Sequence, residues 1–348
     1  MINVYIDPTS YVHLNNVFFR EDSKYNTNNC RGPFIFLKKY CHEKGINLNT
    51  IDLWNPSAAN ATDIYVSFDH KSLLRKFYWK LRNKNYPIIN PKRFKKKILF
   101  HFEPPVVIPE IRYMYKKIMK IYDKVFFTWE TDIPKIRHFH TPLPILGNGV
   151  SPDYWANTNR KFLTIINSNR RLFSYYKELL TERVRAIIFF SWTNDIDLYG
   201  RDWDKPPLFP YWLHKNTIKK VYKGPVEDKY KKLSEYNFAL AYENCELPGY
   251  ITDKIFDCFY VGTVPIYLGD PDVEKYIPKD CFVDMRDFKN YEELKTFLKS
   301  LTESEIKKYK ENARLFLESE RVEFFTKEYF ANIFMEVCIG GRVRTIIN

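Results

Sequence analysis

Short runs of apolar residues alternate with amphipathic stretches along most of this chain, and no other feature of the sequence constrains its fold as strongly. Apolar runs of about four to eight residues are typical of strands buried on both faces, whereas apolar residues spaced three and four apart are typical of helices. Strands that alternate with helices form parallel βαβ units. The alternation therefore predicts an α/β fold.

The predicted elements fall into two series. In the first half, the predicted strands are residues 4–6, 46–53, 63–68, 97–102 and 124–128, and the predicted helices are residues 33–44, 71–84 and 113–121. In the second half, the predicted strands are residues 162–167, 196–199, 238–242, 264–268 and 281–284, and the predicted helices are residues 174–190, 252–260, 291–301, 303–319 and 324–337.

A stretch rich in Pro, Gly, Asn and Ser, residues 142–159, separates the two series and is interpreted as a linker. We therefore expect an N-terminal domain in residues 1–148 and a second domain in residues 149–325. Residues 326–348 form a C-terminal helix and tail, which can pack back on the first domain. Ligands of open α/β sheets bind beyond the carboxyl ends of the strands, so we expect a cleft between the domains to hold the site.

Charge and cysteine content narrow the class of protein. The chain has 55 basic and 42 acidic residues, a net charge of +13, and its densest basic stretches are residues 71–84 and 92–97. We interpret these stretches as solvated faces, and peripheral attachment to a membrane is the next interpretation. Nucleic-acid binding is a remote alternative, since no nucleic-acid fold signature accompanies these stretches. The six cysteines are scattered, which argues against a zinc site and against a disulfide framework and fits a reducing compartment. Residues 1–7 are predicted as a strand, and no run approaches the roughly 18 apolar residues that span a bilayer. We expect a cytoplasmic protein, with peripheral membrane contact left open.

The segment from residue 236 to residue 270 carries most of the chemical information. Its first strand ends in Glu243 and Asn244, two polar side chains at a carboxyl strand end. Thr252 then precedes a helix as a predicted N-cap, and Lys254 lies in the first helical turn. A helix N-terminus with an added positive charge favours an anion such as a diphosphate. The next strand is bracketed by glycines, which allow a backbone to approach a ligand closely.

This segment reads YNFALAYENCELPGYITDKIFDCFYVGTVPIYLGD. It resembles the donor-binding signature of glycosyltransferase family 10, the α-1,3/4-fucosyltransferases: F-x-(F/L)-x-(F/Y)-E-N, a short loop, Y-(I/V/W)-T-E-K and G-T-(V/I)-P-(I/V)-x-x-G. The resemblance extends weakly upstream to about Leu99 and downstream to about Asp287. It implies a GT-B fold, in which two Rossmann-like domains face each other across a cleft, with the acceptor bound by residues 1–148 and the nucleotide sugar by residues 149–325. It also implies a GDP-fucose donor and inversion at the anomeric carbon.

The resemblance also implies the residues that bind the donor. The matching positions are Glu243, Asn244, Tyr250, Thr252, Asp253 and Lys254. Asp253 stands where the family usually has Glu, and the loss of one methylene shortens the reach of the carboxylate by about 1.5 Å. This departure leaves the donor sugar open, so the alternative function is a GT-B transferase of another GDP-deoxyhexose.

An arginine pair upstream resembles the family's R-x-R-x-x-(F/Y) helix. Arg183 and Arg185 precede a strand that ends at Gly200. We predict that Arg185 binds the diphosphate, because a guanidinium suits phosphate oxygens, with Arg183 as a further candidate. Arg170 and Arg171 are the fallback.

The candidate catalytic base lies in the N-terminal half. The predicted strand 97–102 ends in Glu103-Pro104-Pro105, which resembles the family's F-E-(S/N)-P segment. An acceptor hydroxyl loses its proton as it attacks, and a carboxylate can accept that proton. Glu130, in the sequence Trp-Glu-Thr-Asp after the next strand, is the competing candidate.

Two further sets of polar residues receive a structural interpretation. Asp195 and Asp197 form a D-x-D pattern, but we interpret them as acids at a strand edge, and the resemblance implies no obligatory metal, with stimulation by a divalent metal left open. His138 and His140 are interpreted as structural or acceptor-site residues. The resemblance implies an inverting transfer of fucose from GDP-fucose to a glycan hydroxyl, on a GlcNAc or glucose unit in α-1,3 linkage. It does not name the acceptor, and a lipid-linked acceptor is among the possibilities.

Overall fold

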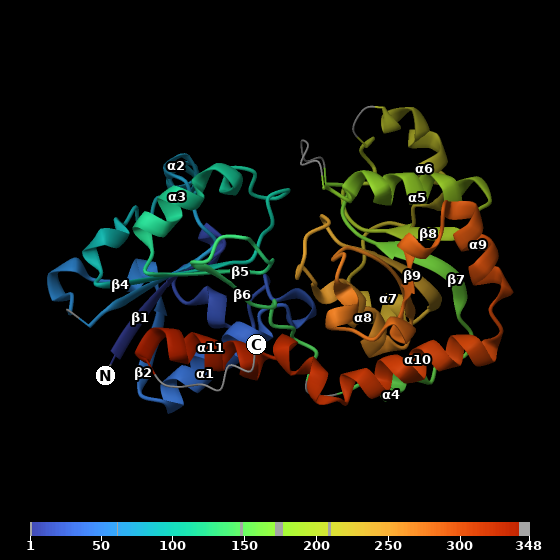
Figure 1. The fold of residues 1–348 in the computed structure, drawn as a ribbon. Coiled ribbons are helices and arrows are strands. Elements are labelled where there is room, and N and C mark those ends of the chain that lie inside the picture. The colour runs from blue at the N-terminus through green and yellow to red at the C-terminus, as the bar shows by residue number, and fades with distance from the viewer. Residues whose placement is uncertain (1, 61, 147–148, 171–176, 208–209, 341–348) are drawn as a thin grey trace. The chain divides into compact units, whose positions relative to one another are not determined.

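The computed structural model describes residues 2–60, 62–146, 149–170, 177–207 and 210–340. It contains two compact α/β units, coloured largely blue-green and yellow-orange in Figure 1. One unit is built from Met1–Pro144 together with the segment from Glu323 onward, and the other from Ile145–Val322. Each unit has its own parallel sheet, so the predicted α/β class with two Rossmann-like halves is confirmed.

The sheet of the first unit has six parallel strands in the order β2-β1-β3-β4-β5-β6. Its strands are β1 (Ile2–Asp7), β2 (Ile46–Thr50), β3 (Ile64–Phe68), β4 (Lys96–His101), β5 (Lys124–Phe127) and β6 (Ile136–His138). In the pairing of the central strands β3 and β4, Val66 lies opposite Ile98. Every residue of β3 is buried, as expected for a strand covered on both faces.

Four helices cover this sheet: α1 (Gly32–Glu43), α2 (Leu73–Arg82), α3 (Ile111–Ile121) and α11 (Lys327–Ile339). Figure 1 shows α1 and α11 on one face of the sheet and α2 and α3 on the other. The right-handed crossovers of parallel strands account for this division, since the strand order reverses direction at β1.

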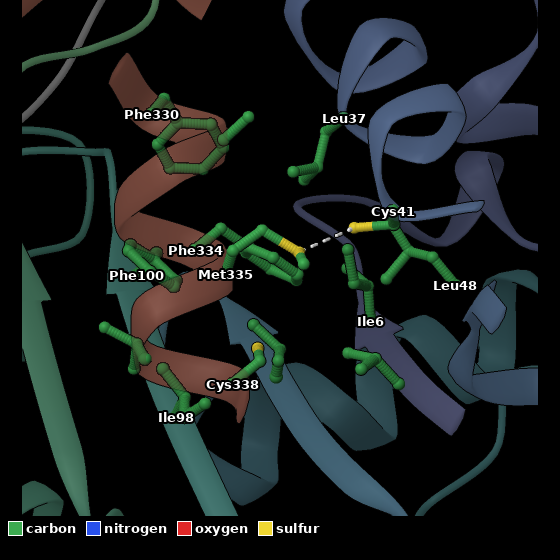
Figure 2. Close-up of a cluster of buried hydrophobic side chains, with 14 of the residues drawn as sticks. Ile6, Leu37, Cys41, Leu48, Ile98, Phe100, Phe330, Phe334, Met335 and Cys338 are labelled. Carbon is green, nitrogen blue, oxygen red and sulfur yellow. Dashed lines mark hydrogen bonds between the residues drawn. The ribbon is translucent and has the colours of Figure 1, made fainter. Parts of the chain in front are cut away.

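Helix α11 comes from the end of the chain but belongs to the core of the first unit. Figure 2 shows its apolar side chains facing α1 and the sheet, with Cys41 Sγ 3.8 Å from Met335 Sδ. The Tyr40 hydroxyl donates to Asn332 Oδ1 over 2.8 Å, and Lys96 Nζ donates to the Cys338 carbonyl over 2.9 Å. These contacts join α11 to both α1 and β4.

The basic stretch 71–84 is not the uniformly solvated face that its charge predicts. Lys71 is buried, and its ammonium donates to the carbonyls of Phe68 and Asp69 at 2.7 and 3.0 Å and lies 3.5 Å from Asp7 Oδ1. Lys76 is also buried and lies 4.0 Å from Asp7 Oδ2. The prediction is therefore wrong for these two lysines, because a buried carboxylate at the end of β1 pairs with them.

The sheet of the second unit has five parallel strands in the order β11-β10-β9-β7-β8. Its strands are β7 (Lys161–Ile166), β8 (Ile196–Tyr199), β9 (Tyr236–Tyr242), β10 (Val264–Leu268) and β11 (Val283–Asp284). Its helices are α4 (Pro152–Trp155), α5 (Leu180–Trp192), α6 (Lys215–Val221), α7 (Lys229–Leu233), α8 (Asp253–Val261), α9 (Tyr291–Ser300) and α10 (Glu303–Leu317).

Several predicted boundaries differ from those observed. The predicted strand 46–53 ends at Thr50, and a single 3₁₀ turn follows it. The start of the predicted helix 174–190 lies partly outside the described residues, which show the helix from Leu180 onward. The stretch interpreted as a linker contains α4, whose Trp155 indole donates to the carbonyls of Phe259 and Tyr260. Among the described helices, none combines the length and the apolar character needed to cross a bilayer.

Candidate active site

Strands β7, β8, β9 and β10 run in parallel, so their carboxyl ends meet at one edge of the second sheet. The central strand β9 delivers Glu243 and Asn244 to this edge, as the sequence predicts. The Glu243 main-chain N–H donates to the Leu268 carbonyl over 2.8 Å, which extends the pairing of β9 with β10. The polar residues after β9 therefore lie on a rigid part of the sheet.

A buried network joins the end of β9 to the start of α8. The Glu243 carboxylate is fully buried and accepts hydrogen bonds from the Thr252 main-chain N–H and from Lys254 Nζ, both over 2.7 Å. Thr252 Oγ1 lies 3.0 and 2.9 Å from the two carboxylate oxygens and accepts a hydrogen bond from Lys254 Nζ over 2.7 Å. We call Glu243, Thr252 and Lys254 the β9–α8 network.

Thr252 and Glu243 make contacts that the sequence did not predict. Thr252 is the N-cap residue of α8, but its hydroxyl bonds Glu243 and no side-chain cap is formed. Glu243 is enclosed, and its carboxylate orients Thr252 and Lys254. Lys254 alone is partly exposed, with 27% of its side chain accessible. It presents a positive charge at the first turn of α8, where main-chain N–H groups have no partner within the helix.

The glycine after β10 encloses this network. A Cβ atom at Gly269 would lie 2.6 Å from Glu243 Cγ and 2.5 Å from the Tyr267 hydroxyl oxygen. Within the protein, the close approach that this glycine permits is to Glu243 and Tyr267. Gly262, before β10, has a φ of +69° and ends α8 in the left-handed conformation.

Asp253 belongs to a second group of charges beside the β9–α8 network. Its carboxylate accepts a hydrogen bond from Lys229 Nζ over 3.0 Å, and Lys229 also forms an ion pair with the buried Asp257. Burial opposes ionisation of Asp253, but Lys229 and Lys254 offset it and hold the pKa of Asp253 below its ordinary value. Burial raises the pKa of Asp257 to about 7. The negative charge of Asp253 adds to this rise, and the positive charge of Lys229 opposes it. Asp253 is therefore an anion whose carboxylate remains 46% exposed.

The two arginines of α5 face different sides of the helix. Arg183 is buried and donates to the Tyr242 carbonyl, from Nη2 over 2.6 Å, and to Asn244 Oδ1 over 3.1 Å. Arg185 bonds Glu182 and the Tyr211 hydroxyl instead. Residues two apart on a helix point in different directions, so only one of the pair can reach the end of β9. The structure brings Arg183 there, and not the Arg185 that we predicted first; burial lowers the pKa of Arg183 to about 10, so its guanidinium stays charged.

The remaining predicted donor residues lie in the same region of the chain. Asn244 is half-buried; its amide oxygen accepts from Arg183, and its main-chain carbonyl accepts from Leu179 N over 3.0 Å. The Tyr250 side chain is buried next to the loop that leads to Thr252. Of the fallback pair, Arg170 is exposed after β7, and Arg171 lies outside the described residues.

Glu103 follows β4 in the first unit and is held there through its main chain. The buried Asp69 carboxylate accepts hydrogen bonds from the N–H groups of Phe102 and Glu103 over 2.7 and 3.1 Å, and from His101 Nδ1 over 2.9 Å. Asp69 has a φ of +64°, a left-handed conformation that Asp tolerates better than most residues. Burial opposes ionisation, but His101 and Lys71 offset it and keep the pKa of Asp69 below its ordinary value. One ionised carboxylate thus fixes the turn that carries Glu103.

The competing base, Glu130, follows the neighbouring strand β5 at the same edge of the sheet. It is exposed, whereas Glu103 is half-buried. The Thr128 hydroxyl donates to the Phe102 carbonyl over 2.8 Å and links the two strand ends. Both candidates are therefore at the carboxyl edge of the first sheet, and only Glu103 is anchored by Asp69.

The D-x-D pattern and the histidine pair have structural partners. Asp195 forms ion pairs with Lys295 and Lys299, and Asp197 with Lys161 and Lys223. No cluster of three or more His, Cys, Asp or Glu side chains suited to a metal occurs within the described residues.

His140 packs its ring 4.2 Å from that of Phe325, and His138 lies at the end of β6. Burial, together with His138, lowers the pKa of His140 far below its ordinary value, so this ring is neutral. The contacts of His140 fit the structural interpretation.

Three residues around the site were not predicted. Asp69 could have been found, because it follows a buried strand as Glu243 does. Asp257 lies one helical turn after Asp253, which is a recognisable spacing for a shared face. Lys229 has no local signal, since it comes from another helix, α7.

Comparison with known proteins places these geometric findings in context. Residues 172–338 match the family described as Glycosyltransferase family 10 (fucosyltransferase) C-term. The α-(1,3)-fucosyltransferase of Helicobacter pylori is 42% identical over 76 residues, which are 22% of this chain and 16% of that protein. Among the curated relatives described, the matched stretches span 16% to 24% of the relative's length.

Two solved structures are similar over nearly the whole chain. A crystal structure of an α1,3-fucosyltransferase with GDP has a TM-score of 0.53 and 15% identity, and the match covers 98% of this chain and 91% of that one. An α-glucosyltransferase in complex with UDP and a 13-mer DNA has a TM-score of 0.56 and 10% identity, covering 97% and 99%. At such identities the likeness concerns the fold, and it confirms the predicted GT-B class.

Proposed function

Because residues 172–338 match the model of glycosyltransferase family 10, we propose that this chain is an inverting transferase that moves a fucosyl residue from GDP-fucose to a glycan hydroxyl. The observation that carries the proposal is the β9–α8 network. Glu243 holds Thr252 and Lys254 so that a partly exposed ammonium lies at the N-terminus of α8. A helix N-terminus combined with a fixed cation suits a diphosphate, and it stabilises the negative charge that develops on the departing GDP.

The other residues of the second unit receive roles from their contacts. Arg183, with Asn244, would stabilise the strand end and face the diphosphate side of the site, the role first predicted for Arg185. Tyr250 would contact the donor from the loop before Thr252. Asp253 would accept hydrogen bonds from hydroxyls of the donor sugar, since its carboxylate is ionised and partly exposed.

Glu103 is the proposed catalytic base. As the acceptor oxygen attacks the anomeric carbon, its proton passes to the Glu103 carboxylate, and the bond between that carbon and the phosphate oxygen breaks. The electron pair of that bond leaves with GDP, and attack from the opposite side inverts the anomeric configuration. Asp69 supports the proposal by fixing the turn in which Glu103 lies. No metal is needed for this step, because Lys254 and the start of α8 supply the positive charge.

The proposed acceptor is a GlcNAc or glucose unit, joined in α-1,3 linkage. All six cysteines are free thiols, which favours a cytoplasmic setting for the reaction. A lipid-linked glycan would fit that setting.

A second candidate function is transfer of a different GDP-deoxyhexose, and it is favoured by one observation. Asp253 replaces the usual Glu, and its carboxylate accepts a hydrogen bond from Lys229 Nζ. Its reach to the sugar is therefore shorter than that of the family carboxylate.

A panel of GDP-sugars offered to the purified chain, with release of GDP and glycosylated product both measured, tests these functions. GDP-fucose should be the preferred donor, and Lys254→Ala and Glu103→Ala should each abolish most transfer. Lys289→Ala is a matched control, because Lys289 is 88% exposed on the surface of the second unit. Preference for another GDP-sugar would replace the fucose assignment, and full activity in both variants would refute the mechanism.

A further inference from the structure

Helix α2 exposes its apolar side and buries part of its polar side. Lys76 and Trp79 face the sheet, whereas Leu74, Phe77 and Leu81 point to solvent with 84%, 61% and 83% of their surface exposed. Positions three and four apart share a face of a helix, so these three side chains form one stripe. This arrangement is the reverse of an ordinary surface helix, whose apolar stripe faces the core.

The stripe is wider than its three central residues. Leu73 and Tyr78 flank it and are also exposed, so half of this ten-residue helix consists of large exposed apolar side chains. Single exposed apolar residues are common in proteins, but a contiguous group of them marks an interaction surface. The α2 stripe, defined as Leu73, Leu74, Phe77, Tyr78 and Leu81, is therefore a candidate docking surface.

The chain segment that contains the stripe is strongly basic. Residues 71–102 contain eight lysines, three arginines and no acidic residue. Lys71 and Lys76 are buried beside Asp7, but other basic residues of this segment are exposed: Lys80, Arg82, Lys84, Lys92, Arg93 and Lys95. An apolar stripe with a cationic border is complementary to a surface that is apolar inside and anionic at its rim.

Helix α3 extends the same face. Arg75 of α2 lies 3.4 Å from Glu110, the residue before α3, and both helices cover the same side of the first sheet (Figure 1). Tyr113 of α3 is exposed, with Arg112 and Lys116 beside it in sequence. An aromatic ring with a polar tip is typical of the headgroup level of a bilayer.

We propose that α2 docks the first unit on an anionic lipid surface, with its apolar stripe among the acyl chains and its basic residues at the headgroups. The physics of interfacial helices matches each feature: apolar burial supplies one part of the binding and attraction to anionic lipids the other. Nucleic acid would pair with the lysines but offers no partner for exposed leucines. A second copy of this chain would bring two cationic borders together, which opposes association.

Flotation of the full chain with vesicles tests this proposal. The vesicles are phosphatidylcholine alone or phosphatidylcholine with phosphatidylglycerol at 7:3. The chain should float with the anionic vesicles, and Leu74→Ser/Phe77→Ser/Leu81→Ser should weaken that binding by about tenfold or more. A matched triple variant, Trp212→Ser/Leu213→Ser/Leu315→Ser, removes exposed apolar residues from the second unit and should bind as the wild type does.

A fluorescent label distinguishes insertion from electrostatic attraction. Cys30 is the exposed cysteine and the other five are buried, so Cys30→Ser/Leu74→Cys takes an environment-sensitive dye at α2, and Cys30→Ser/Leu315→Cys takes it elsewhere. Anionic vesicles should shift the emission of the α2 dye to shorter wavelength and leave the control dye unchanged.

Three results would overturn the proposal. The first is a wild-type chain that does not float with anionic vesicles. The second is a stripe variant that floats as well as the wild type, or an unchanged α2 dye, since either means that charge alone attracts the chain. The third is a wild-type dimer that the stripe variant converts to a monomer without any vesicle binding, because the stripe would then join two copies. Equal thermal stability of both triple variants shows that the comparison concerns surfaces and not folding.

Discussion

Glu243→Gln removes one charge from the centre of the β9–α8 network while preserving its shape. The glutamine oxygen can still accept from the Thr252 main-chain N–H, which lies 2.7 Å from the native carboxylate. Its amide group, however, would face Lys254 Nζ, and both groups are donors. The substitution therefore breaks the 2.7 Å hydrogen bond from Lys254 without opening a cavity.

The size of the effect follows from burial. A hydrogen bond between charged groups contributes about 1.5–3 kcal/mol, and breaking a buried ion pair costs more because the remaining charge is stranded. Glu243 is fully buried, but Lys254 is 27% exposed and can recover some hydration. We therefore expect the free energy of unfolding to fall by about 2–3 kcal/mol. Lys254 loses its fixed position as well, so GDP should bind about tenfold more weakly, equivalent to about 1.4 kcal/mol.

Urea denaturation and calorimetric titration with GDP measure the two effects. Glu235→Gln is the matched control, since Glu235 pairs with Lys232 on the surface with about a third of each side chain exposed. That pair should contribute under about 1 kcal/mol and leave GDP affinity unchanged. The reasoning is refuted if Glu243→Gln is no more destabilising than Glu235→Gln and binds GDP with wild-type affinity.

Three further predictions concern the first unit. Glu103→Gln should lower the turnover rate by about 100-fold or more with GDP affinity unchanged, whereas Glu130→Gln should retain most activity; the reverse pattern would make Glu130 the base. Asp69→Asn weakens the anchoring of the Glu103 turn, so turnover should fall about tenfold at constant KM for the donor, and a normal turnover rate would show that the anchor is dispensable. Burial lowers the pKa of His70 in the folded chain to about 3, below the ordinary value of 6.5. As the pH falls, the unfolded chain therefore takes up a proton first, and the free energy of unfolding should fall by about 1 kcal/mol per pH unit from pH 6.5 towards 3. His70→Gln should reduce that slope in pH-dependent denaturation, and His42→Gln, at an exposed site, should not; equal slopes would contradict the assignment.

The sequence predicted the strands better than the helices and their ends. Parallel strands buried on both faces are continuous apolar runs, and β3 and β10 match their predicted ranges closely for that reason. The short helices α6 and α7 were missed, because each has few apolar residues and is formed mainly through contacts with longer elements. The burial of Lys71 was also unpredictable from local sequence, since its partner Asp7 is 64 residues away.

The same distinction holds for the candidate site. Glu243, Thr252 and Lys254 come from one strand-loop-helix segment, so local sequence is enough to bring them together. Local sequence could not tell which arginine of α5 reaches β9, because the rotation of that helix is set by the packing of its apolar residues in the core of the second unit. The partner of Arg183, the Tyr242 carbonyl, is 59 residues away. The anchoring of Glu103 by Asp69 likewise joins the ends of two neighbouring strands, 34 residues apart in sequence.

The central claim is that the β9–α8 network binds a GDP-sugar, and calorimetric titration of the wild type and Lys254→Ala with GDP, GDP-fucose and UDP tests it most directly. The wild type should bind GDP, bind GDP-fucose more tightly and discriminate against UDP. Lys254→Ala should lose at least about tenfold in affinity for both guanine nucleotides. Wild-type GDP affinity in Lys254→Ala, or a preference for UDP in the wild type, would contradict it.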